Sequence, residues 1–239
     1  ELGAIVEDGL ARMYPEKAAD GEDIFYYITI YNENYVQPPK PDHVNNAEIT
    51  SGLYKFSDGP EAGDYDRNAT VLFSGPSVVA ALEAQQLLAD NHAVSAELWS
   101  ATSYKRLRAD ALDCDRRNRL SPGTEQLVPM VTRKLHDSQG PIVAVSDWMT
   151  LVPEQIARWT PRAMHVLGTD GFGRSDTREA LRRFFEVDAA HLVVAVLSAL
   201  AADGLATTDE VKAAIEQYGI DPNRPDPAHP DTGAAPIDR

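Results

Sequence analysis

The stretch that decides the fold is ATVLFSGPSVVAALEAQQLLADNHAVSAELWS, residues 69–100. It opens with a short apolar run, turns at Gly75 and Pro76, continues as a run rich in alanine and leucine, and closes with a second apolar run. The first and last runs have the length and composition of strands, and the middle one those of a helix. Because two strands joined by a crossover helix lie parallel, this stretch predicts a βαβ unit.

The same alternation continues on both sides of this unit. A strand at 52–56 precedes it, and strands at 141–147 and 164–169 follow it. Helices are expected between the later strands and after the last one, at 104–120, 126–137 and 147–159 and as three more beyond residue 169. Such alternation predicts the α/β class, with a mostly parallel sheet and helices on both of its faces.

The two ends of the chain differ from this pattern. Residues 2–13 predict a helix closed by Pro15, and DIFYYITIY at 23–31 predicts a strand, Ile24 to Tyr31, covered on both faces. Prolines at 38, 39 and 41 favour an extended connection, and residues 221–239 carry five prolines and little to bury. We therefore expect the end of one domain at 1–35, a linker at 36–51, the main domain at 52–220 and a tail at 221–239.

Composition excludes several classes of function. Acidic residues outnumber basic ones 37 to 22, for a net charge of -15, which disfavours nucleic acid and anionic membranes as partners. The most apolar run, 189–202, is shorter than the ~20 residues of a membrane span. With one cysteine, Cys114, and no metal-ligand spacing, the chain predicts a cytoplasmic protein without disulfide or metal. The first residue, Glu1, suggests a fragment or a processed product.

The loop LGTDGFGRSDTREALRRFF at 167–185 has two interpretations. Its glycines stand in the reverse order of a dinucleotide fingerprint, so they favour a turn, with Asp176 and Glu179 as a capping box for the next helix. The loop also follows a parallel strand, where α/β sheets place their clefts. In the second interpretation, its charges clamp a partner surface through Asp170, Arg174, Asp176 and Arg178.

Three further features have structural explanations beside functional ones. The turn from Ser74 to Ser77 opens a helix and could bind a small anion, although ordinary helix starts look the same. The basic run 105–119 can neutralise itself through pairs four residues apart: Arg106 with Asp110, Asp113 with Arg117, and Asp115 with Arg119. His191 is expected to be a satisfied core histidine, and Cys114 has no activating partner.

Three segments together resemble one family. They are YYITIYNENY at 26–35, DCDRRNRL at 113–120 and, most specifically, the run from Gly168 to Asp188. The chain is similar over most of residues 1–220 to the homodimeric bacterial type of pyruvate dehydrogenase, the decarboxylating first component of its complex. The resemblance implies a transketolase-like carboxyl-terminal domain, preceded by the last helix and strand of the domain that binds the pyrimidine of thiamine diphosphate.

The resemblance also implies the function. The intact enzyme decarboxylates pyruvate oxidatively with thiamine diphosphate and magnesium, and passes the acetyl group to a lipoyl arm of the dihydrolipoyl transacetylase partner. The residues that hold cofactor and metal in the family precede Glu1, so this chain alone is expected to be inactive. The alternative is a non-catalytic interaction module, or an α/β module that binds a small anion at residues 74–77.

Two groups of site residues follow from the resemblance. Asn32, Glu33, Asn34 and Tyr35 are placed at the rim of the substrate channel, where related transketolases hold an arginine at the position of Asn32. The loop from Asp170 to Arg178 is placed at the dimer interface. The helix at 2–13 and the strand after it would belong to a sheet whose other strands are missing, so we expect that strand to dock on the carboxyl-terminal domain or on a second copy.

Overall fold

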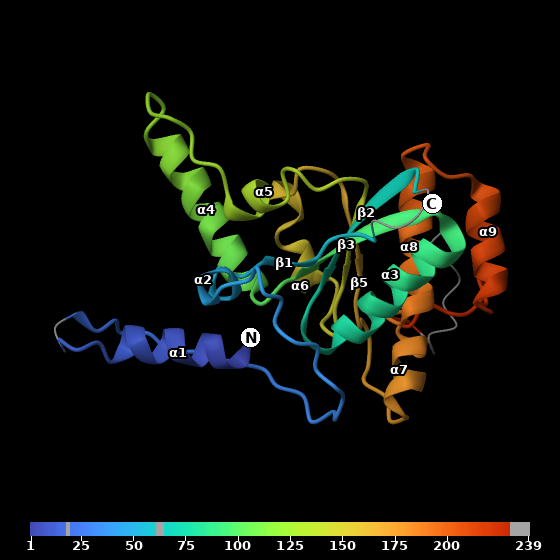
Figure 1. Ribbon diagram of the computed structural model, residues 1–239, viewed down its shortest axis with the longest axis horizontal. Coiled ribbons are helices and arrows are strands. Elements are labelled where there is room, and N and C mark those ends of the chain that lie inside the picture. Colours follow the sequence, from blue (N-terminus) through green and yellow to red (C-terminus); the bar gives the residue numbers. More distant parts are fainter. Residues whose placement is uncertain (18–19, 61–64, 230–239) are drawn as a thin grey trace.

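The computed structural model describes residues 1–17, 20–60 and 65–229. Its centre is a five-stranded sheet in the order β1-β3-β2-β4-β5 (Figure 1). The strands are β1 (Tyr54–Ser57), β2 (Arg67–Phe73), β3 (Val94–Ser100), β4 (Ile142–Val145) and β5 (Met164–Leu167). All neighbours pair in parallel except β1, which runs antiparallel to β3 at one edge. The expected α/β fold with a mostly parallel sheet is confirmed.

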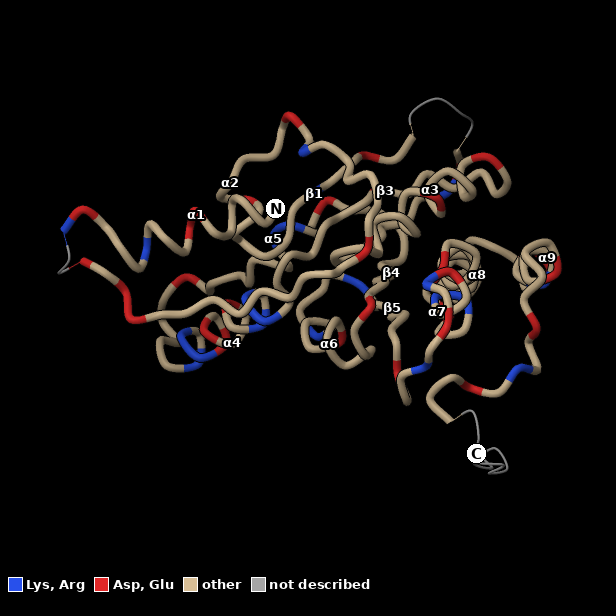
Figure 2. The backbone as a smooth tube through the Cα atoms, turned by 90° about the horizontal axis from the view of Figure 1, so that it is seen from below, with Lys and Arg blue, Asp and Glu red and all other residues tan. Residues whose placement is uncertain are grey.

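Helices cover both faces of this sheet. On one face lie α3 (Val78–His92), α8 (Ala189–Ala202) and α9 (Thr208–Gln217), with the short α7 (Arg178–Phe184) leading into α8 (Figures 1 and 2). On the other face lie α4 (Tyr104–Leu120), α5 (Met130–Lys134) and α6 (Leu151–Glu154). This two-sided cover explains why β4 is buried at all four of its positions.

Each face has its own apolar core. Side chains that alternate along β2 divide between them, with Val71 and Phe73 on the α3–α8 side and Leu72 on the α4–α6 side. The segment 178–202 has the length and hydropathy of a membrane span, but the helix stops after Phe184 and resumes at Ala189. Seven residues of α8 are buried, which makes it a core helix, as its apolar run predicts.

The predicted elements of the main domain are confirmed where the apolar pattern is strong. The helix expected at 126–137 shrinks to α5, since Pro129 stands at its start. The helix expected at 147–159 becomes α6 and a 3-10 turn, η3 (Ala157–Trp159). A short helix, α2 (Asn46–Thr50), with a capping box between Asn45 and Glu48, lies inside the region predicted as linker.

The amino-terminal region projects from the body (Figure 1). The predicted helix is present as α1 (Leu2–Met13), and Glu1 beside it accepts hydrogen bonds from Tyr54 (2.7 Å) and Ser100 (2.5 Å). The strand predicted at 24–31 is wrong. Those residues are extended but form no ladder, and Phe25 and Tyr27 are more than four-fifths exposed. A lone strand has no neighbour to satisfy its backbone groups, so the pattern alone cannot hold it in a sheet.

Candidate functional site

The sheet has one topological switch point, between β2 and β4. The chain leaves β2 through α3 on one face and leaves β4 through α6 on the other, and the carboxyl ends of two such strands are where open α/β sheets form a crevice. Three polar residues stand there: Ser74 and Ser146, whose hydroxyls are 2.8 Å apart, and Asp147. This is where ligands bind in open α/β sheets, so it is the candidate site.

Residues 31–35 dock beside this switch point, where Tyr31 meets Asp147. Arg182 of α7 donates two hydrogen bonds to the carboxylate of Glu33, at 3.1 and 2.5 Å, in a fork geometry. Arg178, one turn earlier, donates to Asn32 and lies over the ring of Tyr31, 5.8 Å from its centroid. Tyr35 packs against the core on the α3–α8 side. The segment is therefore tied to the main domain by charge and by apolar contact.

The electrostatics of this cluster follow from its burial. Burial raises the pKa of Tyr31 to about 12, and the negative charge of Asp147 adds to the effect. Burial also raises the pKa of Asp147 itself, against the opposite pull of Arg182. Burial alone would lower the pKa of Arg182, but its hydrogen bond to Glu33 prevails and raises it. Arg182 thus remains a cation between two carboxylates.

Asp147 also has an unsatisfied atom. Its Oδ2 is buried and has no hydrogen-bond partner among the described residues. A buried acceptor atom without a partner costs about 1–3 kcal/mol. Tyr31 and Arg182 both interact with this carboxylate, so the cost falls on Oδ2 alone.

The two groups of residues predicted from the sequence meet here only through Asn32, Glu33 and Arg178. Asn32 and Glu33 of the predicted channel rim contact α7, and Tyr35 enters the core, whereas Asn34 is exposed. From the predicted interface loop, only Arg178 reaches this cluster. The other three residues act inside their own loop: Asp170 accepts from the Thr150 amide at 3.0 Å, Arg174 lies 4.3 Å from the Phe184 ring centroid, and Asp176 accepts from the Thr177 amide.

The turn chemistry of this loop is confirmed only in part. A Cβ on Gly168 would lie 2.6 Å from the backbone of Trp148 and Thr150, and Gly171 has a φ of +99°. The predicted capping box is wrong by one residue, because Thr177 is the N-cap of α7 and accepts from the Ala180 amide at 3.3 Å. The helix begins at Arg178 and Thr177 has the extended backbone of an N-cap, so the hydroxyl of Thr177 is the group placed to cap it.

Sequence reasoning missed Asp147 and Arg182. Asp147 follows the apolar run of β4, and Ser74 follows that of β2, so a polar residue after each of two predicted parallel strands was the available signal. Arg182 gave no such signal, because its partner Glu33 lies 149 residues away in the sequence.

Other candidates prove structural. His191 is the satisfied core histidine that we predict, with Nδ1 2.7 Å from Asp188. Burial raises the pKa of Cys114 and so keeps its thiol protonated. In the turn from Ser74 to Ser77, Gly75 takes a φ of +53° while Ser77 is only 2% exposed, which leaves Ser74 and the backbone as its accessible polar groups.

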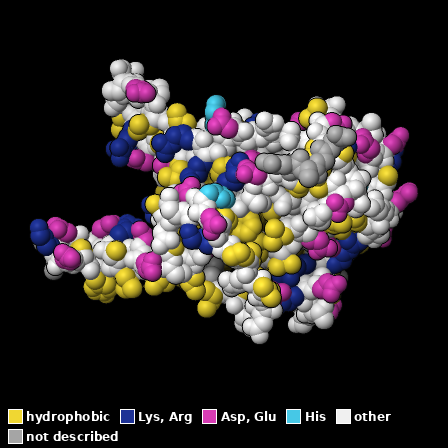
Figure 3. Space-filling model, in the orientation of Figure 1, with side chains coloured by type: hydrophobic (Ala, Val, Ile, Leu, Met, Phe, Trp, Pro, Cys, Tyr) yellow, Lys and Arg dark blue, Asp and Glu magenta, His cyan; other side chains and the backbone are white. Residues whose placement is uncertain are grey.

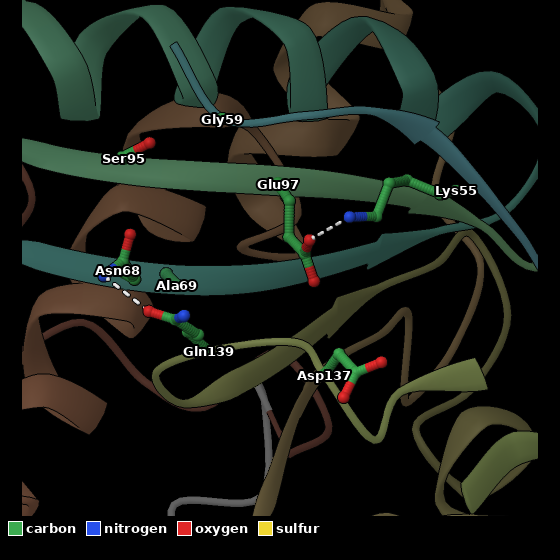
Figure 4. Close-up of a pocket in the computed structure, with 8 residues that line it drawn as sticks. All are labelled: Lys55, Gly59, Asn68, Ala69, Ser95, Glu97, Asp137 and Gln139. Atoms are coloured by element: carbon green, nitrogen blue, oxygen red, sulfur yellow. Dashed lines mark hydrogen bonds and ion pairs between the residues drawn. The ribbon is translucent and has the colours of Figure 1, made fainter. Parts of the chain in front are cut away.

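A second hollow, of about 260 Å³, opens at the opposite ends of the strands (Figure 4). Its central charge, Glu97, is already engaged by Lys55 at 2.7 Å and by the indole of Trp99 at 2.8 Å. Asn68 bonds Gln139 across the hollow. Since these groups satisfy one another at the amino ends of the strands, we regard this hollow as structural.

Comparison with known proteins defines the family. Residues 52–188 match the model described as "Transketolase-like TK C-terminal domain". The pyruvate dehydrogenase E1 component of Mycobacterium tuberculosis is 46% identical over 221 residues, which is 92% of this chain and 23% of that protein. The E1 components of Cupriavidus necator and Escherichia coli are 40% and 39% identical, over 95% of this chain and 25% of theirs.

The chain thus spans about a quarter of the length of these curated relatives. Among solved structures, transketolase from Leishmania mexicana covers 67% of this chain, with 16% identity and a TM-score of 0.44 over 20% of that protein. The family model matches more than half of the chain, so the chain belongs to the family of transketolase-like carboxyl-terminal domains, and its curated relatives are pyruvate dehydrogenase E1 components.

Proposed function

We propose that this chain is the carboxyl-terminal part of a cytoplasmic pyruvate dehydrogenase E1 component. The observation that carries the proposal is the 46% identity of this chain to an E1 component. The match covers 92% of the chain, so it takes in residues 31–35 as well as the sheet domain. The activity proposed for the whole enzyme is oxidative decarboxylation of pyruvate and transfer of the acetyl group to lipoyl on dihydrolipoyl transacetylase. Bound thiamine diphosphate with magnesium would supply the carbanion chemistry.

The role of this chain is to hold the substrate-channel segment in place, and its residues take no direct part in the reaction. The fork between Glu33 and Arg182 and the bond between Asn32 and Arg178 fix the end of the preceding domain against the sheet domain. Fixing that segment sets the position of Asn32 to Tyr35 at the rim of the substrate channel. Positioning by residues outside the reacting centre can change turnover strongly, because small displacements misalign substrate.

The described residues do not fit the cofactor. They contain no cluster of three His, Cys, Asp or Glu side chains able to hold a metal ion. We therefore propose that cofactor and metal are held by other parts of the enzyme and that this chain alone does not turn over pyruvate.

A dimer contact is the second element of the proposal. The loop from Asp170 to Arg178 exposes Phe172, which is 86% accessible, at its tip. Its charged side chains are engaged within the chain, so the apolar ring is the group left to meet a second subunit. Replacement of Phe172 with Ser should then weaken dimers in sedimentation experiments without loss of helix content.

A chimera tests the function directly. The last quarter of the Mycobacterium tuberculosis E1 component is replaced by this chain, and pyruvate-dependent dye reduction is measured with thiamine diphosphate and magnesium. We expect turnover from the chimera and none from this chain alone. A folded chimera that binds cofactor but does not turn over, or turnover by the isolated chain, would contradict the proposal.

A further inference from the structure

The helix α4 carries charge that the rest of the chain does not neutralise. The self-neutralising pairs predicted for it are only partly present: Arg117 bonds Asp113 at 2.8 Å. The other two carboxylates turn to different partners. Asp110 accepts from the Met130 amide at 2.6 Å, and Asp115 pairs with Arg158 at 2.9 Å. Their engagement elsewhere leaves a surplus of positive charge on α4.

This surplus is confined to one side of the helix. At 3.6 residues per turn, residues 105, 108, 112, 116 and 119 fall within about 80° of one another around the axis. All five are exposed: Lys105, Arg108, Leu112, Arg116 and Arg119. We call them the basic stripe. Within the described ranges, none of its four cations forms an ion pair or side-chain hydrogen bond.

The neighbouring exposed flank of α4 is balanced in charge. Arg106, Asp110, Asp113 and Arg117 lie within a similar arc, with two charges of each sign. The balanced flank adjoins the stripe across the exposed side of the helix, and the buried side, which includes Leu107 and Cys114, lies beyond it. The stripe is therefore a local feature of one helix side and not a consequence of overall composition, since the chain as a whole is strongly acidic.

The stripe stands on a part of the molecule that projects. Figures 1 and 3 show α4 extending away from the sheet, with dark-blue side chains gathered over it. Two leucines of α4 accompany the charges: Leu112 is 38% exposed and Leu120 60%. Arginine mixed with exposed leucine suits contact with a protein, because phosphate backbones make no use of the apolar groups.

The length of α4 favours a short acidic protein segment over a larger polyanion as the ligand of the stripe. A helix of 17 residues is about 25 Å long, so a short carboxylate-bearing segment can lie along it. Salt screens charges beyond about 8 Å, so such a segment feels the stripe and little of the acidic body. A nucleic acid or an anionic bilayer would extend past α4 and meet the acidic surface.

We propose that the basic stripe of α4 is a docking surface for an acidic, partly apolar segment of a partner protein. The partner presents carboxylates at helical spacing to Arg108, Arg116 and Arg119, with an apolar side chain against Leu112. This surface lies apart from the cluster at Glu33 and Arg182 and does not depend on the proposed catalytic role.

The test uses the whole chain and a labelled 16-residue peptide with Glu at spacings of three and four and one central Leu. Binding is followed by fluorescence anisotropy in 50 and 300 mM salt. Reversal of stripe charges, R108E with R116E, should weaken binding at least about tenfold. The matched control, R106E with R117E, changes net charge equally on the balanced flank and should change affinity less than about twofold. Circular dichroism confirms that both variants fold.

Four results would overturn the proposal. The first is no peptide binding at 50 mM salt, and the second is equal weakening by the two double variants. The third is that a Gln-for-Glu peptide binds as well as the acidic one. The fourth is tighter binding of a single-stranded oligonucleotide, of phosphatidylserine vesicles or of a second copy of the chain, the last seen as a dimer that R108E with R116E dissociates.

Discussion

The guanidinium of Arg182 grips the carboxylate of Glu33 through two hydrogen bonds, across 149 residues of sequence. Both side chains are about four-fifths buried, at 20% and 17% exposure. A forked pair at such burial is far more directional than a surface ion pair. It fixes which part of the extended segment meets α7, and so sets the register between the amino-terminal region and the sheet domain.

Loss of this fork should free the segment. Arg182→Ala leaves the Glu33 carboxylate buried without its main partner, and we expect the free energy of unfolding to fall by about 2–4 kcal/mol. Amide hydrogen exchange at residues 31–35 should rise while β2 and β4 remain protected. Urea unfolding and exchange mass spectrometry measure the two effects.

Arg174→Ala is the matched control for that change. Arg174 stacks on Phe184 and has no contact with residues 31–35, so its loss should leave their exchange unaltered. A double-mutant cycle between Arg182→Ala and Glu33→Gln isolates the pair itself. Strict additivity in the cycle would mean that the fork does not hold the segment.

Asp147→Asn should stabilise the protein at neutral pH. Burial raises the pKa of Asp147 above its ordinary value of 3.8, so its ionised form is disfavoured in the folded state. For an acid shifted upward, this penalty is absent below pH 3.8 and reaches its full size once the pH exceeds the folded pKa. The asparagine variant should therefore melt higher than the parent at pH 7, by a margin that shrinks on acidification.

Thermal melts of both proteins between pH 4 and pH 8 provide the measurement. Ser146→Ala serves as a neighbour control, since its hydroxyl contact with Ser74 does not titrate and its effect should be nearly independent of pH. A lower melting temperature for Asp147→Asn at pH 7 would show that attraction to Arg182 outweighs burial.

The ionised carboxylate of Glu210 should stabilise the folded protein, whereas that of Asp147 destabilises it. As part of the α9 capping box it bonds the Thr207 amide, and it also bonds Arg67 at 2.7 Å, which together lower its pKa to about 2. For an acid shifted downward, the stabilisation is complete above pH 4.5 and is lost as the pH falls toward 2. Glu210→Gln should be less stable than the parent at pH 7 and converge with it in acid.

Acid titrations of stability by circular dichroism would show this convergence. Asp209→Asn is the adjacent control, because Asp209 makes only an exposed contact with Lys212 and should matter little at any pH. If the difference in stability between Glu210→Gln and the parent stayed constant from pH 7 to pH 2, ionisation of Glu210 would not be its cause.

An element is predicted correctly from the sequence when the structure supplies the helices or strands against which it packs. The strands β2, β3 and β4 bury most of their residues beneath helices, as their apolar runs predict, and their positions are predicted correctly. The run at 24–31 has an equally strong strand composition but no neighbouring strand. Local pattern predicts the extended shape, whereas a ladder also needs a second chain segment.

The candidate site shows the same limit. Asn32, Glu33 and Arg178 are each identified from the sequence, but they belong to two sites in that interpretation and to one cluster in the structure. The pairs expected on α4 fail for a related reason. Asp110 and Asp115 are close to arginines along the helix, yet the tertiary structure offers a backbone amide and Arg158 instead. Spacing along a helix identifies partners within that helix, but it gives no information about partners from other parts of the chain.

Gly168 provides a last test, of the loop that carries the family signature. A Cβ at this position would lie 2.6 Å from both the Trp148 carbonyl and the Thr150 amide, which are backbone groups that cannot rotate away. We expect Gly168→Ala to destabilise the fold by about 1–3 kcal/mol, as overpacking does, and to disturb the neighbouring Asp147. Gly173, in the same loop, has open space at the corresponding point, so Gly173→Ala should be nearly neutral. Urea unfolding measures the free energy of unfolding of both variants. A loss in Gly168→Ala alone would show that close backbone approach requires the glycine, whereas equal losses would show that the loop needs glycine for another reason.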